Sequence, residues 1–204
     1  MATTRVTGFS LIELMVAMTV MALLMMAVSP SVTAWIVNLR IRNATDALQN
    51  GLQAARNEAV RRNQTMTFWL VSDTSPAALT ASCTLSATSG SWVVSVSSPA
   101  GACNSAPSTT TAPMLVAAHP LGDGSGSTVT IAAVQSDLST AASSVAFNGF
   151  GRTTSATSIR RINVTSTTSP SNYRSLRIIL SDAGSIRVCD PAAPSGDPRT
   201  CPSP

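Results

Sequence analysis

The chain has 204 residues, 13 of them basic and 9 acidic, so its net charge is +4 and its length suits one globular domain with an additional segment. All the basic residues are arginines and there is a single histidine, His119, which excludes Walker-type phosphate loops, Ser-x-x-Lys nucleophiles, two-histidine metal sites and protein kinases. Serine and threonine contribute 55 residues while charged residues make up only 11% of the chain, a composition typical of an exported, loop-rich β domain.

An apolar segment near the N-terminus is predicted to form a membrane-spanning helix. Residues 9–28 contain one charged residue, Glu13, and the eight residues before them contain only Arg5. As a helix with a rise of about 1.5 Å per residue, this segment is about 30 Å long, which matches the hydrocarbon core of a bilayer. Arg5 favours a cytoplasmic N-terminus.

A cleaved signal peptide is the alternative interpretation of this segment. Val32, Thr33 and Ala34 are small residues that would allow an exported soluble protein to be released by cleavage after Ala34. Glu13 argues against this interpretation, because an unpaired carboxylate inside an apolar helix costs about 2.5–3.5 kcal/mol.

The residues around Glu13 form a specific motif. The string Gly8-Phe9-Ser10-Leu11-Ile12-Glu13-Leu14 resembles the cleavage and methylation signature of type IV pilins and of the pseudopilins of type II secretion. The resemblance implies that a prepilin peptidase cuts between Gly8 and Phe9 on the cytoplasmic face and methylates the new N-terminus at Phe9. It also implies a leader peptide of residues 1–8, followed by a helix of residues 9–29 that anchors the chain in the membrane and later joins a filament core.

Glu13 then has an expected role in assembly. Cleavage would place the Phe9 amine four residues from Glu13, or about 6 Å along a helix. In a stack of subunits, the carboxylate of one chain can neutralise the amine of the next inside an apolar core, and such a buried pair can fix the register between chains.

Residues 30–63 are predicted to form an amphipathic helical stem. Pro30 should bend or interrupt the helix, since proline lacks an amide donor and clashes with the preceding turn. Beyond Pro30 one apolar stripe should pack on a β domain, while the arginines off the stripe form a solvated face. Gly51 is expected to be a soft point or a site of close packing. The stripe comprises Ile41, Ala44, Leu48, Leu52, Ala55 and Ala59, and the arginines are Arg40, Arg42, Arg56, Arg61 and Arg62.

Residues 64–204 are predicted to form a periplasmic domain of short strands separated by segments rich in Ser, Thr, Gly and Pro. The segments around residues 72–90 and 98–127 are interpreted as loops. The predicted fold class is therefore α+β, with a long N-terminal helix packed on a small antiparallel β domain, which is also the architecture that the pilin resemblance implies. Strands are expected at residues 65–71, 92–97, 129–132, 144–148, 161–165, 175–181 and 185–189.

The last two of these strands form the clearest hairpin. A three-residue turn at residues 182–184 would make Ser181 face Ser185. Alternation then predicts that one face of the hairpin is apolar and that the other carries two arginines. The apolar face would pair Leu180 with Ile186 and Ile178 with Val188, and the opposite face would carry Arg177, Ile179 and Arg187.

Further stretches, residues 52–64, 147–149 and the closing residues 187–191 with 196–201, resemble the GspH/FimT branch of pilin-like proteins. This branch contains the minor pseudopilin H of type II secretion and the FimT and FimU minor pilins. The resemblance implies a non-enzymatic minor pilin or pseudopilin of a type II secretion pseudopilus or a type IV pilus, held as a single-pass protein in the bacterial inner membrane. The expected partners are other pilins or pseudopilins, contacted through the N-terminal helix, and the prepilin peptidase. No cofactor is expected.

Four cysteines allow three pairings, of which Cys83 with Cys103 and Cys189 with Cys201 are local. Both bridges are expected in an oxidising periplasm, and the second would contribute about 3 kcal/mol by closing a short loop. A zinc site is the alternative, but the chain has no Cys-x-x-Cys pair and His119 is far from any cysteine in sequence.

The basic residues are concentrated in the C-terminal third, which suggests a phosphate-binding surface. FimT proteins of natural transformation carry a Gly-Arg-x-Arg motif that contacts DNA, and residues Gly184-Ser185-Ile186-Arg187 resemble it, with Ser185 in place of the first arginine. Arg177 could substitute for that arginine, so DNA is a further candidate partner. Scattered solubilising charge is the alternative. The arginines concerned are Arg152, Arg160, Arg161, Arg174, Arg177, Arg187 and Arg199.

Two other patterns are weak. Residues 122–126, Gly-Asp-Gly-Ser-Gly, supply one carboxylate where calcium needs several oxygen ligands, so they are interpreted as a turn. His119 could belong to a Ser-His-Asp triad, but the chain has no Gly-x-Ser-x-Gly elbow, and a histidine before Pro120 is more often a loop residue. No catalytic or metal-binding residue is therefore expected.

Overall fold

The computed structural model describes residues 10–73, 78–121, 128–168 and 173–202, with only the backbone described at residues 27–30. Gly8, Phe9 and the glycine-rich segment 122–126 lie outside the described residues. The chain divides into two compact units, Met1–Ile36 and Val37–Pro204. The β domain belongs entirely to the second unit.

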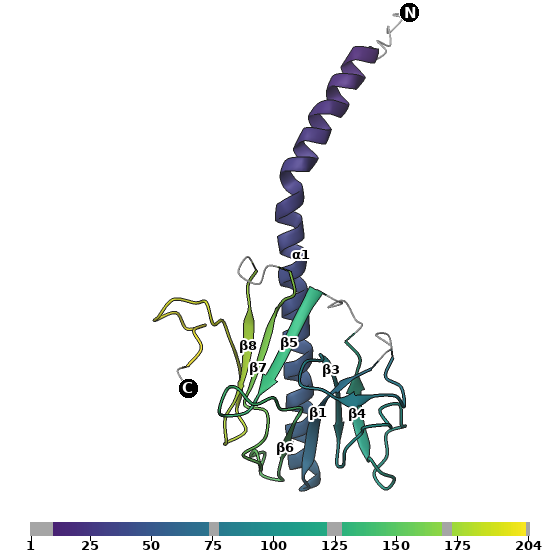
Figure 1. Cartoon of the computed structure of the whole chain (residues 1–204), viewed down its shortest axis with the longest axis vertical. Coiled ribbons are helices and arrows are strands. Elements are labelled where there is room, and N and C mark those ends of the chain that lie inside the picture. The colour runs from purple at the N-terminus through teal and green to yellow at the C-terminus, as the bar shows by residue number, and fades with distance from the viewer. Residues whose placement is uncertain (1–9, 74–77, 122–127, 169–172, 203–204) are drawn as a thin grey trace, which may run out of the picture. The chain divides into compact units, whose positions relative to one another are not determined.

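One helix, α1 (Leu11–Arg62), contributes to both units (Figure 1). Ser10 caps its N-terminus, since the Ser10 hydroxyl oxygen accepts a hydrogen bond from the Glu13 amide at 3.2 Å. Arg61 and Arg62 lie in its last turn, where positive charge is favourable to the helix dipole. The helix is continuous at residue 30, so Pro30, which was expected to bend or interrupt the helix, does not interrupt it. A single proline removes one backbone hydrogen bond, and the turns on either side keep theirs.

The first sheet has five antiparallel strands in the order β2-β1-β3-β4, with β6 also paired to β1. Its centre is the pairing of β1 with β3, in which Phe68 lies opposite Val94 and Leu70 opposite Trp92. The strands are β1 (Met66–Ser72), β2 (Thr84–Leu85), β3 (Ser91–Ser95), β4 (Leu115–His119) and β6 (Ser144–Phe147).

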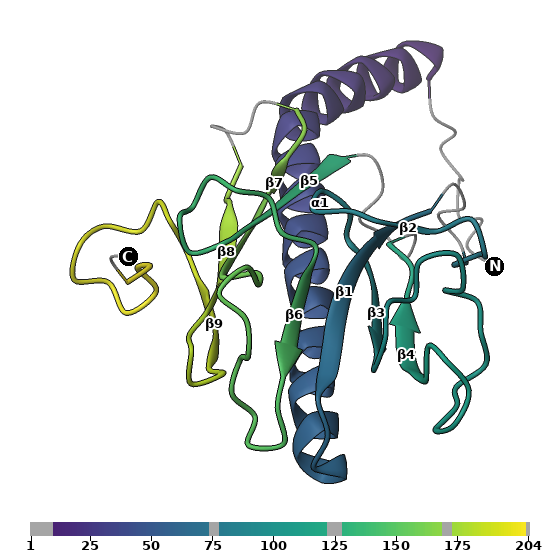
Figure 2. The ribbon, with the colours of Figure 1, turned by 60° about the horizontal axis from the view of Figure 1, so that its bottom comes forward.

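The second sheet has four antiparallel strands in the order β5-β7-β8-β9 (Figure 2). The predicted hairpin is confirmed, because Leu180 pairs with Ile186 and Ile178 with Val188. At its turn the Ser181 amide donates to the Ser185 carbonyl at 3.1 Å. The strands are β5 (Val129–Val134), β7 (Arg161–Ser166), β8 (Leu176–Leu180) and β9 (Ile186–Cys189).

The second half of α1 and both sheets share one hydrophobic core (Figure 2). The predicted apolar stripe of the helix is confirmed. Five of its six residues are fully buried, and Ala44 is 4% exposed. The stripe packs with Phe68 and Trp92 of the first sheet and with Ile162 and Ile178 of the second, so the helix joins two sheets that have no long shared edge.

Gly51 lies at the closest approach of α1 to the first sheet. A Cβ atom added at Gly51 would lie 2.6 Å from Cε2 of Trp92 and 2.8 Å from Cε2 of Phe68. The prediction of close packing at this position is therefore confirmed, and only glycine leaves room for the two aromatic rings.

The β domain differs from the prediction in two respects, the extent of its loops and the place of His119. Its strands divide into two antiparallel sheets, and β2 and β4 lie in segments interpreted as loops. His119 is the last residue of β4 and stacks on Trp92, with ring centroids 5.6 Å apart, so the prediction that it lies in a loop is wrong. The sequence of β4, Leu-Val-Ala-Ala-His, has no clear alternation, and its strand structure comes from pairing with β3.

The arginines of the stem do not all form a solvated face, which corrects that part of the prediction. The Arg56 guanidinium donates to the Gly151 carbonyl at 3.1 Å, and Arg40 donates to the Thr128 hydroxyl at 3.2 Å. Arg61 and Arg62 both pair with the buried carboxylate of Glu58. The Arg61 hydrogen bond is the main cause of a lowered pKa at Glu58. Long arginine side chains can lie along the protein surface and still reach such partners.

Disulfides join Cys83 to Cys103 and Cys189 to Cys201. These are the two local pairings that the sequence predicts. The first bridge lies in a small second core with Val71, Val93 and Leu115. The second holds the C-terminal segment beside the end of β9, where the Asp190 amide also donates to the Arg199 carbonyl at 2.8 Å.

Candidate functional site

The N-terminal candidate site is described from Ser10 onward. Glu13 lies in the first turn of α1, is exposed, and has no ion pair among the described residues. Its spacing from Ser10 is that of a capping box, in which the serine hydroxyl satisfies a free amide of the first helical turn. The Glu13 amide is thus satisfied by Ser10, and its side chain is exposed in the first turn of α1.

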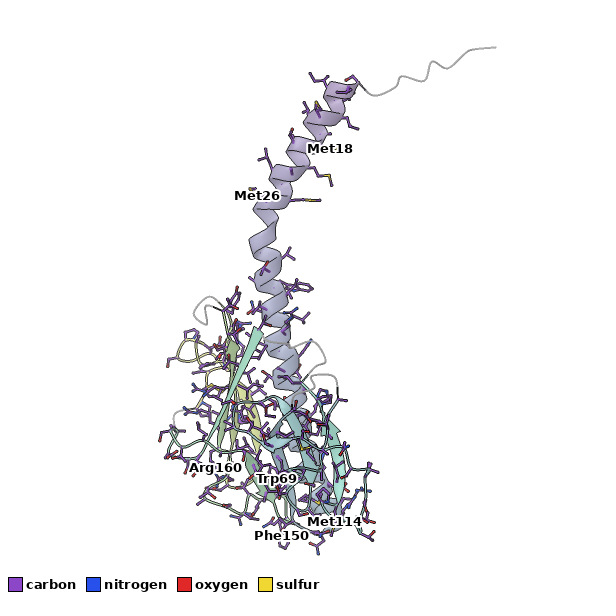
Figure 3. The ribbon with its side chains drawn as sticks, turned by 45° about the vertical axis from the view of Figure 1, so that its right-hand side comes forward. Met18, Met26, Trp69, Met114, Phe150 and Arg160 are labelled. Carbon is purple, nitrogen blue, oxygen red and sulfur yellow. A yellow bond between two sulfur atoms is a disulfide. The ribbon has the colours of Figure 1, made fainter. Side chains whose placement is uncertain are left out.

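The helix that follows presents apolar side chains all around its axis. Leu11 is 76% exposed and Met26 is 77% exposed, and Figure 3 shows Met18 and Met26 extending from the helix. Among the described residues, α1 is the one helix long and apolar enough to cross a membrane. A helix that is apolar on every side requires an apolar environment, which is either lipid or other helices.

The outer face of the second sheet carries three arginines from three neighbouring strands. Arg161, Ile179 and Arg187 are successive partners across β7, β8 and β9, and Arg177 lies opposite Cys189. Their neighbours Ile162 and Ile178 are fully buried on the opposite face. Because side chains alternate between the two faces of a strand, the three arginines share the outer face. We call Arg161, Arg177 and Arg187 the arginine face.

No ion pair forms at the arginine face among the described residues. Arg177 donates to the Asn163 amide oxygen at 2.8 Å, while Arg187 is exposed. Burial lowers the pKa of the Arg177 guanidinium, and the nearby charge of Arg161 lowers it further. The charges of Arg161 and Arg177 therefore repel each other, and charge-assisted hydrogen bonds to a phosphate would offset that repulsion.

Three other arginines of the C-terminal third are paired with acids. Arg160 pairs with Asp182, Arg174 with Asp190 at 3.1 Å, and Arg199 with Asp197 at 2.7 Å. The Arg199 hydrogen bond is the main reason that the pKa of Asp197 falls to about 2. The seven arginines predicted to form one basic surface therefore divide into three that are paired with acids, the three of the arginine face, and Arg152, which is exposed in the segment between β6 and β7.

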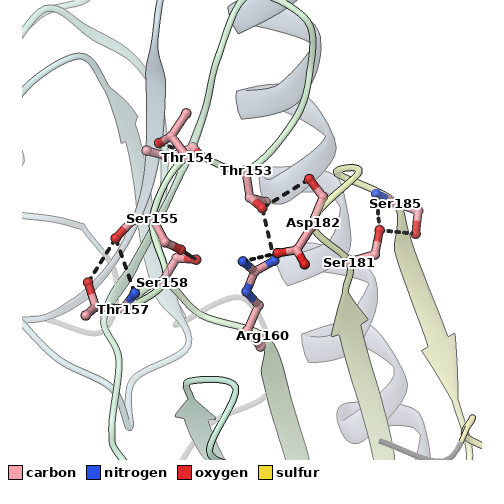
Figure 4. Close-up of polar contacts among 10 residues, drawn as sticks. Thr153, Thr154, Ser155, Thr157, Ser158, Arg160, Ser181, Asp182 and Ser185 are labelled. Carbon is pink, nitrogen blue, oxygen red and sulfur yellow. Dashed lines mark hydrogen bonds and ion pairs between the residues drawn. The ribbon is translucent and has the colours of Figure 1, made fainter.

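The Arg160 pair is a structural contact that sequence reasoning missed. Arg160 precedes β7, donates to the Thr153 hydroxyl at 3.0 Å and contacts the carboxylate of Asp182 (Figure 4). The Thr153 amide in turn donates to the Asp182 carbonyl at 3.3 Å. These contacts attach the turn of the β8–β9 hairpin to the segment between β6 and β7.

Gly184, a predicted member of the DNA-binding motif, is buried in the hairpin turn. Its φ is +78°, and a Cβ atom at this position would lie 1.8 Å from the Gly151 carbonyl oxygen. That carbonyl also accepts the Arg56 hydrogen bond. The structure thus gives Gly184 a packing role that accounts for the glycine without any ligand.

Comparison with protein families gives two matches. The family described as type II transport protein GspH matches residues 44–184, and the prokaryotic N-terminal methylation motif matches residues 3–29. The chain belongs to the GspH family. Together with the methylation motif, this makes it a minor pilin or pseudopilin. Proteins of these families are structural subunits that are processed by prepilin peptidase and assemble with other pilins.

No curated protein matches the GspH-family chain. Its fold is similar to two crystal structures of the type IV minor pilin FimU from Pseudomonas aeruginosa PAO1. The structure in space group P21 is 17% identical, with a TM-score of 0.45, and the match covers 79% of this chain and 94% of the FimU chain. The structure in space group P65 is 16% identical, with a TM-score of 0.43, and the match covers 78% and 98%.

The structure of this GspH-family chain bears on the alternative of a zinc site. The four cysteines are all in disulfides, so they are not zinc ligands. The described segments contain no cluster of three histidine, cysteine or acidic side chains that could hold a metal ion. Glu13 belongs to the first unit, while Arg177, Gly184 and Arg187 belong to the second.

Proposed function

We propose that this GspH-family chain is anchored in the inner membrane by residues 9–29, with residues 64–204 in the periplasm. It is incorporated through its N-terminal helix as a minor subunit of a type II secretion pseudopilus or a type IV pilus. The observation that carries the proposal is a methylation motif followed by a helix that is exposed and apolar on all sides. Such a helix is stable in lipid and in a bundle of like helices.

Processing between Gly8 and Phe9 is the first prediction of this proposal. The mature chain is expected to begin at an N-methylated Phe9, which mass spectrometry of the membrane-extracted protein would detect. Gly8→Leu should leave the chain at its precursor mass, because the peptidase needs a small residue before the cut. An N-terminus at Trp35 would instead identify a cleaved signal peptide and contradict the proposal.

Glu13 provides the second prediction. Glu13→Ala should leave membrane insertion intact, because it makes the N-terminal helix more apolar, yet it should reduce incorporation into filaments severely. In the filament a neighbour's Phe9 amine would be left buried without a partner. Membrane fractionation and filament shearing separate the two effects. Met15→Ala, which changes an exposed apolar residue of the same helix, is the control, and normal incorporation of Glu13→Ala would contradict the assembly role.

Binding of DNA is the second candidate function, and the arginine face is the observation that favours it. Three arginines without acidic partners on one sheet surface can contact successive phosphates of a nucleic acid backbone. Ser185, in place of the first arginine of the FimT motif, bonds its hydroxyl to that of Ser181 at 2.8 Å. It offers no positive charge, so we expect weak binding that does not depend on sequence.

Salt dependence tests this candidate function. The affinity of the full chain for duplex DNA, measured by fluorescence anisotropy, should fall as salt rises, because phosphate contacts release counterions. Arg187→Ala and Arg177→Ala should each reduce the slope of log affinity against log salt by about one. Arg199→Ala is the matched control, since Asp197 already neutralises that charge. Ser185→Arg should strengthen binding, and equal slopes for all variants would exclude the arginine face.

A further inference from the structure

Two residues of the first unit differ in chemistry from the apolar surface between them. Glu13 is an exposed carboxylate without an ion pair in the described residues, and Trp35 is an indole that is 65% exposed. They are 22 positions apart (35 − 13) in one continuous helix. At about 1.5 Å per residue, this spacing corresponds to about 33 Å.

That distance is close to the thickness of the hydrocarbon core of a bilayer, about 30 Å. The most apolar run of the sequence, residues 9–28, would instead place Glu13 four residues inside the core. Before assembly, no neighbouring chain supplies an amine to pair with that carboxylate. A charged carboxylate is far more stable at the headgroup level, so the isolated subunit gains by shifting residues 9–13 out of the core.

If residues 9–13 leave the hydrocarbon core, the segment that then fills the core contains no charge. Residues 14–34 include the hydroxyl residues Thr19, Ser29, Ser31 and Thr33 but no acid or arginine. A hydroxyl in a helix can bond to the backbone of the preceding turn, as Thr19 does to the Val16 carbonyl at 2.9 Å. Such a bond lowers the cost of placing the hydroxyl in lipid.

Trp35 then falls at the outer surface of the membrane. Tryptophan is enriched at membrane interfaces because its ring is apolar while its N–H needs a polar partner. Val32 and Ile36, three residues before Trp35 and one after it, are 47% and 39% exposed. Residues three and four positions apart lie on the same side of a helix. Val32, Trp35 and Ile36 therefore form one apolar edge that can enter the membrane interface.

We propose that, in the unassembled subunit, residues 14–34 occupy the hydrocarbon core, with Glu13 at the inner headgroup level and Trp35 in the outer interface. This inference rests on the proposed membrane anchoring and deepens it. The embedded segment is shifted by five residues (14 − 9), or about 7.5 Å along the helix, from the segment that composition alone selects. Pairing of Glu13 with a neighbour's amine would then favour the change from the membrane position to the filament position.

Depth-dependent fluorescence quenching tests the proposal. The full chain is reconstituted in phosphatidylcholine vesicles that carry bromine either near the lipid carbonyl or near the end of the acyl chain. Bromine near the carbonyl should quench the tryptophan emission more strongly than the deeper bromine. This quenching should be lost in Trp35→Phe and retained in Trp69→Phe, which removes a tryptophan of β1 in the second unit.

Glu13→Gln tests whether the Glu13 charge sets the depth of the helix in the bilayer. Without the charge, residues 9–28 can fill the core, so quenching by the shallow bromine should decrease as Trp35 moves outward. Unchanged quenching would show that Glu13 does not position the helix. Equal emission of the wild type in both brominated lipids and in unbrominated lipid, or stronger quenching by the deep bromine, would overturn the placement of Trp35. Vesicle flotation keeps the two proposals distinct, because a chain that does not float with lipid contradicts membrane anchoring itself.

Discussion

Gly184→Ala is expected to lower the free energy of unfolding of the β domain by about 3 kcal/mol. Two effects add at this position. The φ of +78° disfavours a residue with a Cβ atom, and the new methyl group would overlap the Gly151 carbonyl oxygen, which is backbone and cannot rotate away. Displacing that carbonyl would also weaken the hydrogen bond that it accepts from Arg56.

The chain contains controls that separate these two effects. Gly196 has a φ of +92° with nothing within 4 Å of an added Cβ, and Gly101 has a φ of +77° with its nearest contact at 3.9 Å. Gly196→Ala and Gly101→Ala should therefore cost only the backbone strain, about 1–2 kcal/mol. Urea denaturation in mild detergent, followed by circular dichroism, measures all three. Equal losses for the three variants would show that crowding against Gly151 contributes nothing.

Local patterns are sufficient to predict some elements of this fold. The β8–β9 hairpin follows from alternation on both strands and from Gly184 at the end of a three-residue turn, so both its register and its faces can be read from the sequence. The stem follows from apolar residues at helical spacing, of which Leu48 and Leu52 are fully buried. In both cases the residues that determine the structure are close together in the chain.

Contacts between distant segments could not be predicted in this way. The strand β2 has two residues, both exposed, so its sequence carries no periodic signal. Arg160 and Asp182 are brought together by the second sheet, and the sequence alone does not distinguish an arginine with an acidic partner from one without. This is why seven candidate arginines were predicted where three form the arginine face.

Gly51 shows how a local rule can be reversed by tertiary packing. In an exposed helix, alanine is more favourable than glycine by about 1 kcal/mol. In α1 the missing side chain of Gly51 accommodates Trp92 and Phe68, whose ring centroids are 5.9 Å apart. Both rings are buried between the helix and the first sheet, so neither can move aside without disturbing the core.

Gly51→Ala is therefore expected to lower the free energy of unfolding by about 2 kcal/mol despite the gain in helix propensity. Gln53→Ala, on the exposed side of the same helix, should change the free energy of unfolding by less than about 0.5 kcal/mol.

A double-mutant cycle with Trp92→Leu tests the cause of the loss in Gly51→Ala. If the indole is the obstacle, the loss from Gly51→Ala should largely disappear in the Trp92→Leu background, since the smaller side chain leaves room for the new methyl group. An unchanged loss in that background would mean that the helix meets another obstacle at this position, and a gain in stability from Gly51→Ala alone would show that α1 can shift relative to β3 more easily than the packing implies.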